Sequence, residues 1–161
     1  MKTTKSLKTN DPMGKSFLVC LFSLILLLFI NNAYAQKTAV GGNWSASASW
    51  SPAGVPVSTD AVTIPNGVTI TVDVSNATCA SVAINTGSAN GTGTLQFNSG
   101  SVLTVSGSVT LGGSGPKVGN LTMTNGGTLK IGTTFTVTNG TFTPGTGTIE
   151  YNGSAQTIYA A

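Results

Sequence analysis

Few side chains in this sequence are equipped for acid–base or nucleophilic chemistry. Beyond residue 35, the carboxylates are Asp60, Asp73 and Glu150, the thiol is Cys79, and the chain has no histidine. Without histidine, the Ser-His-Asp and Cys-His types of nucleophilic site are excluded, and the commonest metal ligand is missing. No basic residue stands near Cys79, which comes just before an apolar pair, so we interpret it as a small buried hydrophobe.

Two carboxylates can hydrolyse a glycosidic bond when they lie roughly 5–9.5 Å apart. Asp60 and Asp73 are near enough in sequence to form such a pair, whereas Glu150 stands far along the chain. No Arg or His accompanies them, and no calcium loop of the D-x-D-x-D-G type is present. We therefore predict a non-enzymatic protein with no catalytic residues, no metal site and no cofactor.

Two tryptophans offer one further binding chemistry. Trp44 and Trp50 lie in a stretch that also contains Pro52 and Pro56. Exposed indole rings would give a platform for sugars, which makes extracellular glycans a candidate partner. Buried rings would instead fill the core of a cap, and we favour this second interpretation.

The first 35 residues have the order of a secretory leader. Four lysines come first, an apolar run covers residues 17–30, and the small-residue pattern Ala33-Tyr34-Ala35 follows. The run is shorter than the roughly 20 residues that a membrane helix needs. We predict a signal peptide over residues 1–35, cleavage after Ala35, no membrane span after cleavage, and a secreted, extracellular or cell-surface protein.

Removal of this leader changes the charge of the chain. The remaining three lysines balance the three carboxylates, so the net charge falls to about zero. Binding to nucleic acid or to an anionic membrane needs clustered Lys or Arg, and no cluster is left. Cys79 then stands alone, which excludes an internal disulfide.

A repeat of 26 residues links Leu95–Leu111 with Leu121–Val137. Seven positions match when the two segments are aligned: six apolar residues align with apolar residues, and Gly100 aligns with Gly126. Each unit contains three short alternating strands separated by turns, which is typical of a three-sided solenoid. We expect looser joints at 85–94 and 112–120.

The same pattern extends in both directions. Upstream, the pairs Val62/Ile64, Ile70/Val72 and Val82/Ile84 are predicted to form the three sides of one coil; downstream, Ile149 and Tyr151 restart the first side. Asn66-Gly67, Ser99-Gly100 and Asn125-Gly126 are expected to share one corner, because Gly and Asn tolerate a positive φ.

These observations predict an all-β fold, a right-handed parallel β-helix with an N-terminal cap, with an antiparallel β-sandwich as the alternative. The cap is assigned to residues 36–61 and the coils to residues 62–161. The chain stops at Tyr159-Ala-Ala161, within a coil. We therefore expect further coils of a longer polypeptide as its partner.

Gly42-Asn-Trp44, Trp50, Pro56 and residues 60–68 carry a resemblance to a known group. They resemble the N-terminal region of large secreted β-solenoid surface proteins of gliding-type Gram-negative bacteria. More weakly, the chain is similar to the eight-glycine extracellular domain family. The resemblance implies a stalk or adhesin and brings no catalytic residues.

The sequence thus favours a non-enzymatic structural or adhesive β-solenoid module of a cell-surface protein. Two alternatives stay open. One is a carbohydrate-binding module that uses Trp44 and Trp50, and the other is the N-terminal fragment of a polysaccharide-active β-helix enzyme.

Overall fold

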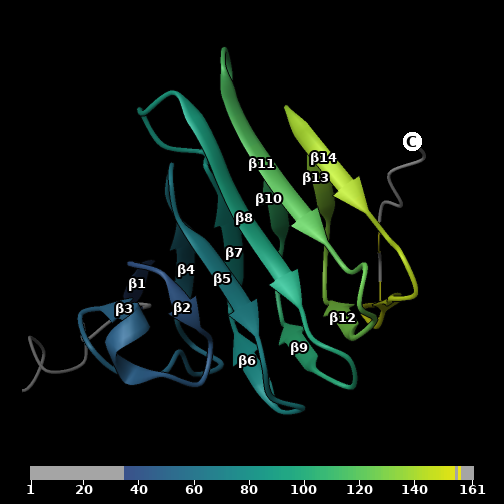
Figure 1. The fold of residues 1–161 in the computed structure, drawn as a ribbon. Coiled ribbons are helices and arrows are strands. Elements are labelled where there is room, and N and C mark those ends of the chain that lie inside the picture. The colour runs from purple at the N-terminus through teal and green to yellow at the C-terminus, as the bar shows by residue number, and fades with distance from the viewer. Residues whose placement is uncertain (1–34, 155, 157–161) are drawn as a thin grey trace, which may run out of the picture. The chain divides into compact units, whose positions relative to one another are not determined.

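The computed structural model describes residues 35–154 and 156, so the predicted signal peptide, apart from Ala35, lies outside the described residues. The described chain forms three sheets (Figure 1). Sheet A contains, in spatial order, β3 (Trp50–Ser51), β1 (Gln36–Ala39), β4 (Ala61–Ile64), β7 (Ser81–Ile84), β10 (Val109–Leu111) and β13 (Phe135–Val137).

The other two sheets follow the same progression along the chain. Sheet B contains β2 (Gly42–Asn43), β5 (Thr69–Val72), β8 (Gly91–Phe97), β11 (Lys117–Thr122) and β14 (Gly140–Thr143). Sheet C contains β6 (Ala77–Cys79), β9 (Val102–Val105), β12 (Thr128–Ile131) and β15 (Thr148–Tyr151). The chain visits A, B and C in turn, so three successive strands make one coil.

Neighbouring coils are joined by parallel strand pairing in all three sheets. Among the described strands, only β1 and β3 pair antiparallel. This arrangement is a parallel β-solenoid of about four turns, as the sequence predicted. The antiparallel sandwich is wrong, because its strands would have to alternate in direction within each sheet.

The core lies inside the three sheets and is built from every second residue of each strand. Leu95, Leu103 and Leu111 are fully buried, whereas their neighbours Thr94, Thr104 and Thr110 face outward and are partly exposed. This is the period-2 pattern of a sheet with one dry face. Each buried apolar side chain contributes about 1.5–3 kcal/mol to folding.

The 26-residue repeat is the true register between the second and third coils. Leu95 pairs with Leu121, Leu103 with Leu129 and Val109 with Phe135. Gly100 and Gly126 both have positive φ, at 74° and 97°, and both turn the chain from sheet B into sheet C. The predicted shared corner is confirmed for these two glycines.

The predicted assignment of the first coil is wrong. Val62 pairs with Val82, so both belong to sheet A in successive coils and cannot be the first and third sides of one coil. The third side of the first coil is β6, whose inward residues are Ala77 and Cys79. Asn66-Gly67 therefore lies at the corner from sheet A to sheet B, a different corner from that of Gly100.

The last coil also differs from the prediction. Ile149 pairs with Leu129 in sheet C, whereas the sheet B strand of this coil is β14, with Phe142 opposite Leu121. The segments expected to be loose joints are partly strand, since β8 begins at Gly91 and β11 at Lys117. These strands are longer than the apolar pairs that marked them in the sequence.

No element among residues 35–154 and 156 is a helix with the length and hydrophobicity needed to cross a bilayer.

A pair of adjacent substitutions tests the inward and outward assignment. Leu103→Asp puts a charge into the core and removes a fully buried side chain, so we expect a loss of about 4 kcal/mol or more in unfolding free energy. Thr104→Asp changes the next residue, which faces outward beside Lys130, and should shift stability by no more than about 0.5 kcal/mol. Urea unfolding followed by circular dichroism measures both, and equal losses would contradict the assignment.

Candidate functional site

The two tryptophans lie together in the cap and are both buried. Trp44 is 0% exposed and Trp50 is 2% exposed. Their ring centroids are 4.9 Å apart with planes at 70°, and Trp50 Nε1 donates a hydrogen bond of 2.9 Å to the carbonyl oxygen of Trp44. Edge-to-face packing of this kind stabilises a core. Neither ring offers a face to solvent on which a sugar could stack.

The segment around these rings closes one end of the solenoid. The short 3-10 helix η1 (Ser47–Ser49) leads into β3, which pairs antiparallel with β1 and covers the outer edge of sheet A. The strands β1 and β2 already pair parallel with β4 and β5. The cap segment is therefore both a cover and an incomplete first coil. The sequence indicated the cover but not the coil, because the segment lacks the repeat.

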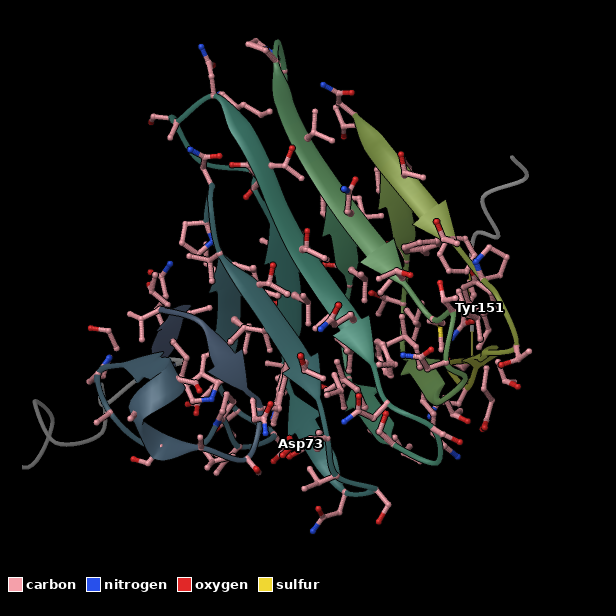
Figure 2. All side chains as sticks on the ribbon, in the orientation of Figure 1. Asp73 and Tyr151 are labelled. Carbon is pink, nitrogen blue, oxygen red and sulfur yellow. The ribbon has the colours of Figure 1, made fainter. Side chains whose placement is uncertain are left out.

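Asp73 fastens this cap to the first coil. Its carboxylate accepts hydrogen bonds from the backbone N–H of Ser45 at 3.0 Å and from the Ser45 hydroxyl at 2.6 Å. Figure 2 shows Asp73 beside the cap, at the end of β5. Because both carboxylate oxygens have donors on the cap, Asp73 is placed for a structural role. No sequence pattern marks Ser45, which is one of many serines.

The other two carboxylates are also engaged in local structure. Asp60 is 4% exposed and accepts a hydrogen bond of 3.0 Å from the backbone N–H of Val57, which closes the turn before β4. Glu150 forms an ion pair of 2.9 Å with Lys130 across sheet C. Asp60 leads into β4, whereas Asp73 follows β5 at another corner of the coil, so the structure does not bring them together as a pair for hydrolysis.

Cys79 points into the core from β6 and is 1% exposed. Burial, and secondarily the charge of Asp60, raise the pKa of its thiol far above the ordinary range. A nucleophilic cysteine requires the opposite shift, since the thiolate is the reactive form. Within residues 35–154 and 156, no three His, Cys, Asp or Glu side chains are grouped as a metal site would need.

Two shallow hollows lie at the corners of the solenoid. One, of about 490 Å³, is lined by residues 73–76 and 99–101, and its single ionisable group is Asp73. The other, of about 440 Å³, lies among small residues at 61, 80–81, 106–108 and 133. Neither hollow combines an acid with a base, and the glycine-rich segment 112–116 is a turn between β10 and β11.

Comparison with protein-family models gives one match, to the G8 domain, over residues 49–159. The matched range begins in η1 and includes every strand from β3 to β15. No curated protein and no solved structure matches this chain.

Removal of one indole tests the role of the tryptophans. Trp50→Ala should lower the unfolding free energy by about 3–5 kcal/mol, because it leaves a large cavity and removes the hydrogen bond to Trp44. Val57→Ala, at a cap residue that is 54% exposed, is the control and should cost no more than about 0.5 kcal/mol. Intact stability of Trp50→Ala, with loss of soluble-glycan binding, would overturn the cap interpretation.

The buried thiol predicts a loss of stability at alkaline pH. The folded-state pKa of Cys79 is raised, so its contribution is fully present below the unfolded pKa and declines above it. Above about pH 8.5 the unfolding free energy should fall by about 1.4 kcal/mol per pH unit relative to Cys79→Ala.

Urea unfolding of both proteins across this pH range measures the difference. Burial also raises the pKa of Tyr151, but that contribution is common to the two proteins and cancels. An Ellman assay should label Cys79 only in denaturant. Rapid labelling of the native protein would contradict the inert, buried thiol.

Proposed function

This chain belongs to the G8 domain family, and from that membership and the geometry above we propose that it is a non-enzymatic structural or adhesive β-solenoid module of a cell-surface protein. The family is typically extracellular, and its match agrees with the weaker of the two resemblances found in the sequence. The leader-like residues 1–35 support export of the chain by secretion.

One observation carries the non-enzymatic part of this proposal. The groups that could do chemistry are committed to the fold: Asp73 holds the cap, Asp60 closes a turn, and Cys79 is a core side chain. An active site needs a base or nucleophile with a shifted pKa in an accessible cleft. Among the described residues, burial raises the pKa of Cys79, which is closed off from solvent, and of Tyr151, whose phenol is thereby held in its protonated form.

The structural part rests on how the chain buries its apolar residues. Because each coil packs on the next over three sheets, the contacts between neighbouring coils stabilise the module, and such an array suits a structural role. Its outer positions are free of packing demands, which suits a protein that presents a surface to partners.

Further coils of a longer polypeptide fit the end opposite the cap. Phe142, Ile149 and Tyr151 in the last coil are only partly buried, although they occupy inward positions. Figure 2 labels Tyr151 at this end of the module. A following coil would complete the burial of these side chains.

Bead retention under flow tests the adhesive role. Beads coated with the chain should be held on extracellular-type surfaces, such as neutral polysaccharide films and frozen or hydrated mineral surfaces, more strongly than beads coated with Leu103→Asp. Display of an ordered surface requires the folded module, so the strongly destabilised Leu103→Asp is the comparison. Equal retention of both bead types on every surface would overturn the proposal.

Release of reducing ends from a panel of polysaccharides tests the non-enzymatic role. The chain should release no more than buffer. Release that is lost in Asp60→Asn or Asp73→Asn would instead establish a hydrolase.

A further inference from the structure

The outer surface of sheet B carries a regular pattern of polar side chains that the core does not require. Outward positions of β5, β8, β11 and β14 form two columns, which we name the threonine face. The first column is Thr69, Thr94, Asn120 and Thr141; the second is Thr71, Gln96, Thr122 and Thr143. Six of these eight residues are threonine.

The columns follow from strand register. Thr69 pairs with Thr94, Thr94 with Asn120, and Asn120 with Thr141, and the second column is paired in the same way. Neighbouring strands lie roughly 4.8 Å apart, and residues two apart on a strand are separated by roughly 6.6 Å. Figure 1 shows these four strands side by side on one side of the solenoid. The face is therefore a two-dimensional lattice in which six positions carry a hydroxyl and a methyl group and two, Gln96 and Asn120, carry an amide.

Threonine is well suited to hold such a lattice. Its branched β-carbon restricts χ1, so the hydroxyl and methyl groups take few orientations without a large loss of entropy on binding. Two contacts add further restraint. Within the face, Gln96 Nε2 donates to Thr71 Oγ1 at 2.8 Å; at its border, the hydroxyl oxygen of Thr122 lies 2.9 Å from that of Thr124 in the turn after β11. These contacts hold Thr71, Gln96 and Thr122 in place before any ligand arrives.

The chemistry of the face narrows the ligand. Neither column contains a charged residue, so anionic polymers and metal ions have no partner there. Neither contains an aromatic ring on which a sugar could stack. What remains is a neutral, periodic ligand that exchanges hydrogen bonds with hydroxyl groups at fixed intervals and tolerates methyl groups between them.

We propose that the threonine face binds the surface of ice. The hydroxyl and methyl groups recur at fixed intervals in two directions, as the oxygen atoms on a face of an ice crystal do, so water ordered along these rows can join the crystal lattice. First-shell waters that bridge to polar groups are held nearly as well as direct hydrogen-bond partners. This inference names a ligand for the proposed adhesive module and rests on that proposed function.

The other two sheets are less suited to this ligand. The outer side of sheet C contains the ion pair between Lys130 and Glu150, which breaks the neutral pattern. On sheet A, the outward column that starts at Thr38 and Thr63 is interrupted by Ala83, and the neighbouring column contains Ala61 and Ser81. Sheet B is also the one with strands of six and seven residues, which give the widest surface.

Threonines of the last coil allow a matched test. Thr141 and Thr143 lie on the threonine face, whereas Thr136 lies on sheet A and Thr148 on sheet C, and all four are exposed. The chain, the double variant Thr141→Lys with Thr143→Lys, and the control Thr136→Lys with Thr148→Lys are compared. Lysine adds bulk and charge equally in both variants, so only the face differs.

Two readouts are measured: the share of protein taken into a slowly growing ice ball, and the ice-grain size after a frozen sucrose solution is annealed. We expect the chain and the control to enter the ice and to keep the grains small. The threonine-face variant should behave like an equal mass of albumin. Circular dichroism must show the same folded signal for all three proteins.

Several results would overturn the proposal. They are exclusion of the folded chain from ice, equal loss in the two double variants, and retention on an insoluble neutral polysaccharide with no effect on ice. The last of these would keep the adhesive function and replace its ligand. Failure of bead retention on every surface would remove the proposed function as well, so the two failures are distinguishable.

Discussion

The constraint on which this structure depends is that three sheets must keep register at the same time. A slip of one residue in any strand would turn its apolar side chains outward. Differences in residue number between coils must therefore be absorbed at the corners. Asn85 illustrates how: it has φ of 48°, is 1% exposed, and donates through Nδ2 to the carbonyl oxygens of Gly91 and, at 3.2 Å, Val118. Its amide fixes a long corner onto the following coil.

Corner length also explains how much of the fold the sequence could predict. Where corners of successive coils are equal, as between Leu95 and Leu121, the repeat is visible without gaps and the predicted register is correct. Between Val62 and Val82 the shift is 20 residues, so a search for 26 residues assigns the pairs to the wrong sides. The strand β6 was missed because Ala77 and Cys79 are small, and a Val/Ile/Leu pattern does not detect them.

The residue types of the candidate site could be predicted from the sequence, but the contacts between these residues could not. The lack of histidine is a property of the sequence alone, and it rules out Ser-His-Asp and Cys-His sites whatever the contacts are. The two tryptophans were identified, and their burial agrees with the cap interpretation. The hydrogen bonds between Ser45 and Asp73 join segments 28 residues apart through the cap, and no local pattern marks such a partner. The columns of the threonine face could not be predicted either, because they depend on the register between coils, and unequal corners obscure that register in the sequence.

Because inward and outward residues alternate, the outward residues of the module can vary without changing the core. Alternate residues of each strand pack in the core and stabilise the fold. The residues between them face solvent and contribute little to stability. The outward residues differ in charge between the sheets: the Lys130–Glu150 pair lies on sheet C, while the columns of sheet B are neutral. Threonine favours strands and is polar without being charged, so it can cover an outer face without weakening the sheet beneath it. A solenoid that is stable through its interior can in this way hold an ordered outer surface at fixed spacing, which a flexible polar chain cannot do.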